Sequence, residues 1–382
     1  MNKCIDLISR GLHQIQRTFL PDLEYEAGPI PETLTRLIYI LETVHSQKIS
    51  IPTWCWVGRP PKSRYGIFNA FIAKAFLKIP TTVNLIERLQ SDRHLRLICG
   101  FETRWQLPSE SVFSRVFAEF AKTQLVHEVH AALVTHSCAE RISGHICRDS
   151  TAIEARESAE KKSKPPESQT ISKRKGRPRK GESRATKEPG RVQKQGAMTL
   201  EEMLKDLPTA CNHGSKKNSQ GFIQTWRGYK LHIDTADGGI PVSAILTSAS
   251  LHDSQAAIPL ATMTAGRVQN FYDCMDTAYD QPEIAEYSRK LGHVPLIDTN
   301  PRRDIVLKDA IESERKARAV LNWNPAEMIR YNARSGAERT NARLKDEFGG
   351  RTVRVKGHPK VYCHLMFGIL VLAADQLLRL IT

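Results

Sequence analysis

The sequence lacks the features that mark secreted, zinc-stapled and membrane-spanning proteins. Its eight cysteines include no C-x-x-C pair and no regular spacing, so neither a disulfide framework nor a structural zinc module is expected. The most apolar run, 365–374, is too short to cross a bilayer and suits a buried core helix. No signal peptide is visible in the first nine residues. These absences predict reduced, mostly buried thiols and a soluble protein of the cytoplasm.

Acidic residues are scarce relative to basic ones. The 382 residues include 56 Lys or Arg against 41 Asp or Glu, which leaves a net charge of +15 with histidine neutral. A chain of this length fits two or three domains, and 40% hydrophobic residues can bury a core, which excludes wholesale disorder. The basic surplus favours a polyanionic partner, nucleic acid before a membrane surface.

Residues 1–140 are predicted to form an all-helical, DNA-binding domain. Apolar residues recur at helical spacing in 82–100 and again in 111–120. Two short helices, followed by a third with Arg115 on its polar side, would form a helix-turn-helix in which Arg115 contacts DNA. A helical bundle whose basic face is merely solvated explains the same pattern equally well.

A strongly basic segment, 156–197, is predicted to be a flexible insert. It holds 14 Lys or Arg against 5 Asp or Glu and no aromatic residue, so burial cannot offset the entropy of ordering it. Its centre reads KRKGRPRK, and a Gly-Arg-Pro core flanked by cations is the composition of an AT-hook. This predicts that Lys175, Arg177 and Arg179 bind the minor groove of A·T-rich DNA. The alternative is a solvated basic tract that binds any polyanion loosely.

The region 141–382 has a mixed α/β pattern. A short strand is expected at 144–150, a hairpin at 229–234 and 241–247, and further strands at 269–274 and 294–298. Helices are expected at 254–263, at 282–291 and, as one long helix with Pro near its start and two glycines at its end, at 325–348. This order predicts a three-layer α/β domain, with a mixed sheet flanked by helices.

Three carboxylates occupy positions from which they can converge. Asp149 ends the first expected strand, Asp276 follows the strand that ends at Cys274, and Glu338 lies midway along the long helix. Hard oxygen ligands of this kind suit Mg²⁺. Two such ions about 3.5–4 Å apart can activate a water or a 3′-hydroxyl and stabilise the leaving oxygen. Any one of these acids alone would more simply be a solvated surface charge.

The long helix strengthens the case for a site. It contains the pattern Y-x₂-R-x₃-E-x₆-K, formed by Tyr331, Arg334, Glu338 and Lys345. At about 100° per residue, all four fall within a sector of roughly 60°. Cations on this face can contact DNA phosphate while the carboxylate holds a metal. An ordinary ion pair between Arg334 and Glu338 explains part of the pattern, but not its other two members.

Together these motifs resemble those of the DDE transposases of bacterial insertion sequences, in the group marked by that Y-R-E-K signature. Asp149, in Arg-Asp-Ser-Thr, matches the first acid of the family, and Asp276, with Tyr279 three residues on, matches the second. Glu338 matches the third acid. Its companions in the signature are Tyr331, Arg334 and Lys345. The stretches 251–254 and 295–303 also look like that family.

The resemblance implies a ribonuclease-H-like core in which Asp149, Asp276 and Glu338 hold two Mg²⁺ ions, for which Mn²⁺ would substitute. It further implies binding to terminal inverted repeats and strand transfer into target DNA by a homodimer, associated with the nucleoid. The DNA contacts would include Tyr331, Arg334 and Lys345. Two alternatives stay open: a metal-dependent nuclease of the same fold, and an inactive transposase-derived DNA-binding protein.

Two smaller assignments also stay open. Asp273 and Asp280 flank Asp276 and could replace it, although the match at Tyr279 favours Asp276. The pair His252–Asp253 either supports the metal ligands or forms a simple turn after a strand, and the turn is slightly favoured.

Overall fold

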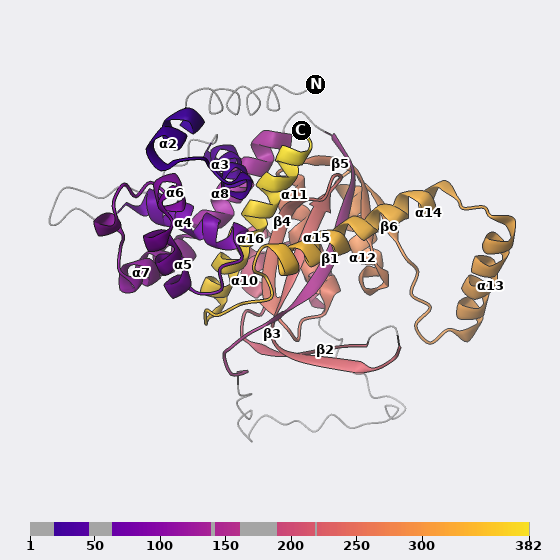
Figure 1. Ribbon diagram of the computed structural model, residues 1–382. Helices are drawn as coiled ribbons and strands as arrows, with labels where there is room; N and C mark the ends of the chain where they lie inside the picture. The colour runs from indigo at the N-terminus through magenta and orange to yellow at the C-terminus, as the bar shows by residue number, and fades with distance from the viewer. Residues whose placement is uncertain (1–18, 46–62, 139–141, 161–188, 218–219, 382) are drawn as a thin grey trace, which may run out of the picture.

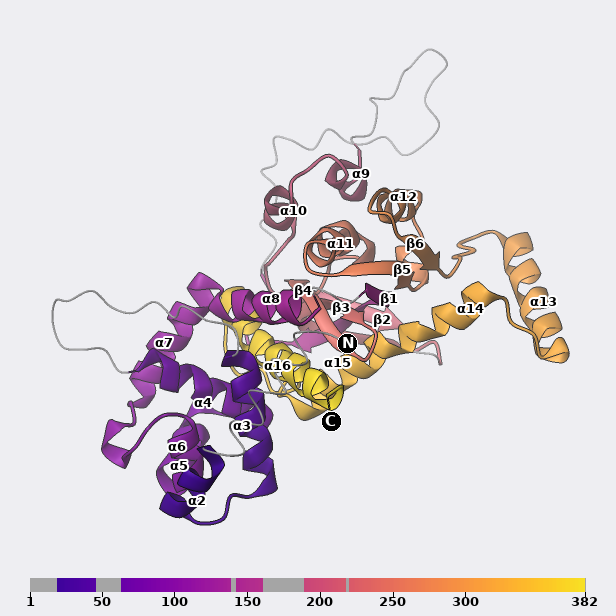
Figure 2. The same ribbon diagram turned by 90° about the horizontal axis from the view of Figure 1, so that it is seen from above.

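The computed structural model describes residues 19–45, 63–138, 142–160, 189–217 and 220–381 (Figure 1). Within these ranges, a group of N-terminal helices lies beside a mixed sheet that is flanked by helices on both faces (Figure 2). This architecture confirms the predicted fold class. It is consistent with a ribonuclease-H-like core.

The N-terminal helices follow from apolar residues at helical spacing and from polar caps. The side chains of Ser63, Thr81 and Asp92 each accept a hydrogen bond from a backbone N–H in the first turn of the helix that follows. The helices are α2 (Phe19–Ala27), α3 (Glu32–His45), α4 (Arg64–Phe76), α5 (Thr82–Ser91), α6 (Arg93–Ile98), α7 (Glu110–Thr123) and α8 (Leu125–Cys138). The helical periodicity at 82–100 and 111–120 is thus confirmed by α5, α6 and α7.

The sheet mixes antiparallel and parallel pairs. Its strands are β1 (Ile142–Glu154), β2 (Asn212–Lys217), β3 (Ile223–Ala236), β4 (Ile240–Ser248), β5 (Gln269–Met275) and β6 (Val294–Ile297). β3 runs antiparallel to both β1 and β4, whereas β1, β5 and β6 are parallel neighbours. The order is therefore β4-β3-β1-β5-β6, and β2 pairs with the first part of β3. β1 is central, which places Asp149 in the middle of the sheet.

Helices cover the two faces of the sheet as separate layers (Figure 2). One layer contains α9 (Arg191–Gln195), α10 (Leu200–Asp206), α11 (Ala257–Ala265) and α12 (Pro282–Lys290). The other contains α15 (Ser335–Glu347) and α16 (His358–Arg379). α16 is the one described helix whose length and composition would let it span a membrane, but most of its apolar stretch is buried inside the protein. It is a core helix, as the run 365–374 predicts.

The N-terminal helices and the sheet share one hydrophobic core. α16 packs against α3, α4, α7 and α8 on one side and against β4 on the other. The ring of Phe367 on α16 lies within 6.5 Å, centre to centre, of four N-terminal rings. These rings belong to Phe68, Phe71, Phe117 and Phe120. The six cysteines in the described ranges are free and buried, as expected.

The predicted long helix at 325–348 is wrong in one respect. The structure divides it into α14 (Ala326–Tyr331), a 3₁₀ turn at Asn332–Arg334, and α15. A 3₁₀ turn advances by 3.0 residues rather than 3.6, so the angular sector calculated for one continuous helix does not apply across it. The Ser335 hydroxyl donates to the carbonyl of Asn332 at 3.0 Å. This local bond competes with the regular backbone hydrogen bonds of an α-helix.

The segment 156–197 is also not flexible throughout. Its end forms α9, in which Val192 and Gln195 are buried. Gln195 donates to the carbonyl of Gln255 at 2.8 Å. Contacts with the rest of the protein therefore order this end of the segment, although its own composition is too polar to do so. Lys175, Arg177 and Arg179 lie outside the described residues, and their minor-groove role stays a prediction.

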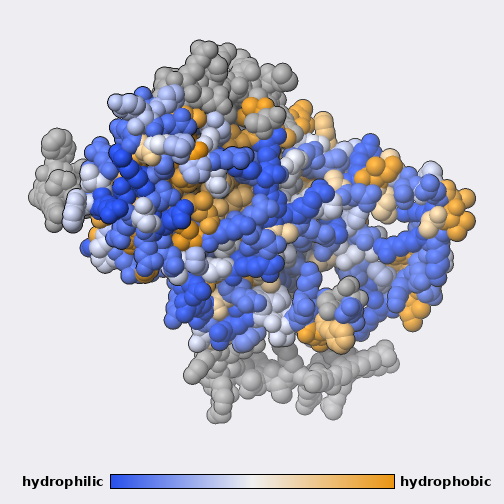
Figure 3. Space-filling model, in the orientation of Figure 1, coloured by the Kyte–Doolittle hydropathy of each residue, from blue (hydrophilic) through white to orange (hydrophobic). Residues whose placement is uncertain are grey.

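One helix, α13 (Ile305–Leu321), has no counterpart in the sequence analysis. It projects from the body of the protein beside α14 (Figures 1 and 2), and the described part of the chain buries none of its residues. Apolar side chains gather on this projection (Figure 3), among them Val306, Val320 and Leu321. Its middle, 308–318, is mostly charged, so the sequence shows no apolar run at this place.

Candidate functional site

The parallel pairing of β1 with β5 brings two of the expected acids together. Cys147 on β1 is in register with Cys274 on β5. Asp149 and Asp276 each follow two residues later, so both side chains emerge on the same face at neighbouring positions. Asp276 is held by the turn after β5, where its Oδ1 accepts a hydrogen bond from the backbone N–H of Ala278 at 2.9 Å.

Both carboxylates are less acidic than usual. Burial raises the pKa of Asp149 to about 6, and the negative charge of Asp276 adds to this effect. The pKa of Asp276 is also raised, mainly by burial and then by the charge of Asp253. Two partly buried carboxylates that repel one another leave a position where a cation would be strongly favoured.

Helix α15 places further groups against this pair. The side-chain N–H of Asn341 donates to Oδ2 of Asp149 at 3.0 Å. Glu338 lies one turn earlier on the same helix, but its side chain is 54% exposed and forms an ion pair of 3.0 Å with Arg334. Glu338 therefore stands beside the two aspartates without joining them.

Arg334 lies among all three acids. Burial lowers its pKa, but neighbouring negative charges, including those of Glu338, Asp149 and Asp276, raise it overall. Its guanidinium also lies 5.7 Å from the ring centre of Tyr331, whose pKa burial raises to about 12. The structure thus brings Tyr331, Arg334 and Glu338 to the aspartates, and Arg334 supplies the positive charge at this point.

The last member of the signature, Lys345, lies two turns beyond Glu338 at the edge of a separate cavity. Burial lowers its pKa, and the nearby charges of Arg351 and Lys216 lower it further. Lys216, on β2, also acts on the pKa values of both aspartates. A line of positive charge therefore runs from the acids towards this cavity.

Three further residues neighbour the site, and of these only Asn341 was not considered from the sequence. Asn341 follows Glu338 by three residues, and helical periodicity could have placed it on the same face. Asp253 forms an ion pair of 2.8 Å with Lys230 and influences Asp276. Tyr279 is buried near the carboxylates, and its hydroxyl has no hydrogen-bond partner among the described residues.

The two open assignments can now be compared with the geometry. Asp273 is buried and bonded to Asn270 and His293, while Asp280 accepts from the backbone N–H of Asn300. Both have structural partners, which favours Asp276 as the second acid. His252 caps the turn that begins at Asp253, which agrees with the favoured interpretation of a turn, and a supporting role at the metal ligands stays a prediction.

Arg115 is not part of this cluster. It lies exposed on α7, and its Nε donates to the backbone carbonyl of Ser111 at 3.3 Å. Its position leaves it open to a partner on the outer surface of the helical region. A contact with DNA at this residue stays a prediction.

The site offers the donors that Mg²⁺ prefers. Asp149, Asp276 and Glu338 supply carboxylate oxygens, and the Oδ1 of Asn341 is buried without a hydrogen-bond partner in the described ranges. As the side chains stand, no three His, Cys, Asp or Glu among the described residues are close enough to hold one metal ion. Glu338 would complete the set by exchanging its ion pair with Arg334 for a bond to the cation.

Comparison with known proteins agrees with this arrangement. A family model described as a transposase DDE domain matches residues 142–373, which is more than half of the chain. A second model, described as a transposase domain (DUF772), matches residues 32–119 in the helical region. No curated protein and no solved structure matches the chain.

Proposed function

The chain belongs to the family of transposases with a DDE domain, and from this we propose that it cuts DNA at the terminal inverted repeats of an insertion sequence and joins the freed strand to target DNA. The observation that carries the proposal is the position of Asp149, on β1, beside Asp276, which directly follows the neighbouring parallel strand β5. Asn341 ties the helix of Glu338 to this pair, which supports Glu338 as the third acid.

Two phosphoryl transfers make up the reaction. Water attacks the phosphodiester at the transposon end and frees a 3′-hydroxyl, which then attacks a target strand, with no covalent enzyme intermediate. Mg²⁺ or Mn²⁺, held as two ions by Asp149, Asp276 and Glu338, would supply Lewis acidity to both steps. Catalysis by the chain itself then consists of positioning and charge stabilisation.

The cations of the signature have separate tasks in this proposal. Arg334 stacks on Tyr331 and sits among the acids, so it would hold the phosphate that reacts, with Tyr331 orienting it. Lys345 lies farther along α15 and would hold the backbone of the same strand. With DNA and metal bound, Glu338 would bind the cation and Arg334 would bind the phosphate, in place of the ion pair that the two side chains form with one another.

The division of labour along the chain is part of the same proposal. Residues 1–140 would bind the transposon end through the face of Arg115, and 141–382 would perform the chemistry. The basic insert 156–197 would add contacts through its AT-hook-like core. Because two ends must be paired before they are joined, the active form is a homodimer on DNA, in the cytoplasm at the nucleoid.

The test is an assay with Mg²⁺ and labelled DNA that carries the ends of the element. We expect cutting at the end and transfer to a second duplex by the wild type, and loss of both in Asp149→Asn and Glu338→Gln while DNA binding persists. Glu347→Gln is the matched control, because it makes the same change nine residues along α15 and should stay active.

Other outcomes of this assay select the alternatives. Cutting without transfer would indicate a metal-dependent nuclease. Binding to the ends without cutting in Mg²⁺ or Mn²⁺ would indicate a DNA-binding protein derived from a transposase. Cutting that survives both Asp149→Asn and Glu338→Gln would refute the assignment of these acids.

A further inference from the structure

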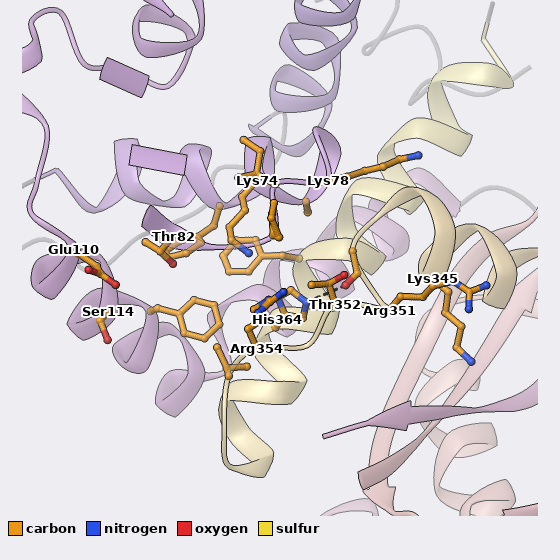
Figure 4. A pocket seen from close by; sticks show the side chains of 18 of the residues that line it. Lys74, Lys78, Thr82, Glu110, Ser114, Lys345, Arg351, Thr352, Arg354 and His364 are labelled. Atoms are coloured by element: carbon orange, nitrogen blue, oxygen red, sulfur yellow. Dashed lines mark hydrogen bonds between the residues drawn. The ribbon is translucent and has the colours of Figure 1, made fainter. Parts of the chain in front are cut away.

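A basic cavity of about 630 Å³ lies where the N-terminal helices meet the end of α15 (Figure 4). Its walls come from α4, α7, α15, α16 and the loop 349–355. The cations that line it are Lys74, Lys78, Lys345, Arg351 and Arg354, against two acids, Glu110 and Asp346. Three phenylalanines of the shared core form its apolar floor.

Lys74 is the most unusual of these cations. It is partly buried, and Figure 4 shows it pointing into the cavity from α4. Within the described residues, no hydrogen bond or ion pair is formed by its ammonium group. Burial lowers the pKa of Lys74 to about 8. A cation that has lost much of its hydration without gaining a partner is a site for an anion.

The rest of the lining points the same way. Arg351 and Asp346 form an ion pair of 2.6 Å, so their charges cancel. Lys78 and Arg354 are exposed at the rim and have no ion pair in the described part of the chain. His364 faces Lys74 from α16, and burial, with the charge of Lys74, lowers its pKa to about 4, so it adds no charge. Glu110 is then opposed by an excess of cations.

Helix α15 links the cavity to the carboxylate site, because it carries Glu338 at one and Lys345 at the other. Glu338 and Lys345 are seven residues apart on this helix, which is about 10 Å at 1.5 Å per residue. One DNA strand carries a phosphate about every 3.4 Å along the helix axis. A duplex that lies along α15, with its reacting phosphate at the acids, would therefore place another phosphate of the same strand level with Lys345 about three nucleotides away.

We propose that this cavity binds the sugar-phosphate backbone of the DNA strand that enters the carboxylate site. Phosphates from about three nucleotides onward would contact Lys345 first, and then Arg354 and Lys74. The bound segment contacts both the helical region and the catalytic core. One DNA strand therefore fixes the position of both parts relative to the phosphodiester bond that reacts. This inference rests on the proposed function for the identity of the strand, but not for the test that follows.

The first experiment measures DNA affinity as a function of salt, in EDTA so that no strand is cut. The full chain is titrated with a labelled duplex carrying the transposon end, between about 50 and 200 mM salt. Each phosphate contact that is lost should reduce the slope of log K against log salt by about 0.9. We expect this reduction for Lys74→Met, which keeps the aliphatic stem, and for the exposed Arg354→Ala.

Lys205→Ala is the matched control. Lys205 is a well-exposed lysine on α10, in the helical layer on the other face of the sheet, and its removal should leave the slope unchanged. Wild-type slopes in both cavity variants would overturn the proposal. An equal reduction in Lys205→Ala would also overturn it, because the effect would then reflect net charge alone.

A second experiment locates the contact on the DNA. Single phosphates of the strand to be cut are replaced by uncharged methylphosphonates, one position at a time. Neutral positions about three or more nucleotides from the end should weaken binding of the wild type but not that of Arg354→Ala. If no position shows this dependence, the cavity does not hold the strand. If the wild type shows this position-dependent loss of binding but never cuts DNA, the proposed function is refuted and the assignment of the cavity stands.

Discussion

At the scale of single residues, the site is a cluster of charges that do not balance without a cation. Asp149 and Asp276 have raised pKa values, and Arg334 is drawn into the same space. Such an arrangement stores unfavourable electrostatic energy in the folded protein, and a bound metal would release it.

Asp149→Asn should stabilise the metal-free protein at neutral pH. The folded pKa of about 6 exceeds the unfolded value of about 3.9, so the charged carboxylate penalises folding as pH rises from about 4 to 6. The gain should be on the order of 1–3 kcal/mol at pH 7 and should vanish near pH 4. Thermal unfolding in EDTA across this range measures it.

The same melting curves in Mg²⁺ provide the control. The metal should raise the melting temperature of the wild type and have little effect on Asp149→Asn, because the variant has lost a ligand. A variant that is less stable than the wild type at pH 7, or whose advantage does not change with pH, would contradict the prediction.

At the scale of elements, buried ion pairs fix the strands and the helix that present the acids. Directly before Asp149 on β1, the guanidinium of Arg148 makes two bonds to the carboxylate of Asp234 on β3, at 2.8 and 2.7 Å. Both side chains are buried, and Thr264 donates to the same carboxylate at 2.7 Å. This network holds the opposite side of the strand from Asp149.

Arg148→Met should destabilise the protein by about 3–5 kcal/mol, because it leaves the buried carboxylate of Asp234 without a counter-charge. Urea unfolding followed by circular dichroism measures the loss. The double variant Arg148→Met with Asp234→Leu should recover most of it, since no unpaired charge then remains. Equal losses in the single and double variants would show that packing, not charge, dominates at this position.

Helix α15 is anchored at its far end by Asp375 on α16. This buried carboxylate accepts from Arg343 of α15 at 2.7 Å, from Arg379 at 3.0 Å and from Arg36 of α3. One acid therefore links α15, α16 and the helical region. Movement of α15 would displace Glu338 and Asn341 from the aspartates.

Asp375→Asn should loosen α15 and cost on the order of 3 kcal/mol, because three arginines lose their shared counter-charge. Hydrogen exchange in 335–347 should accelerate relative to the strands. Glu347→Gln removes the other acidic partner of Arg343. Because the side chain of Glu347 is 40% exposed, this change should cost less than about 1 kcal/mol. Similar effects of the two substitutions would refute the anchoring role.

At the scale of the whole molecule, α16 joins the N-terminal helices to the sheet in a single core. Phe367→Ala should cost about 3–5 kcal/mol, because the cavity it leaves lies among four other aromatic rings. Unfolding should remain one cooperative transition by far-UV and near-UV circular dichroism. Two separated transitions, with the helices melting first, would mean that the parts are independent.

Local patterns predicted much of this architecture. The helical spacing in 82–100 and 111–120, the hairpin around 237–239 and the placement of Asp149 and Asp276 after apolar runs were readable without tertiary information. α13 was missed because its middle, 308–318, is mostly charged and contains no apolar run. The break at Asn332–Arg334 was missed because the flanking residues favour a helix on both sides.

The sequence by itself determined most of the elements and the family, because periodicity and motif spacing are properties of neighbouring residues. Only the tertiary structure decided the chemistry of the individual groups. The raised pKa of Asp149 and the lowered pKa of Lys74 depend on burial, and that of Asp149 also on a charge brought in from a distant part of the chain. Desolvation depends on burial, and Coulomb energy depends on the distance between charges in the folded protein. Neither quantity can be obtained from a pattern along the sequence.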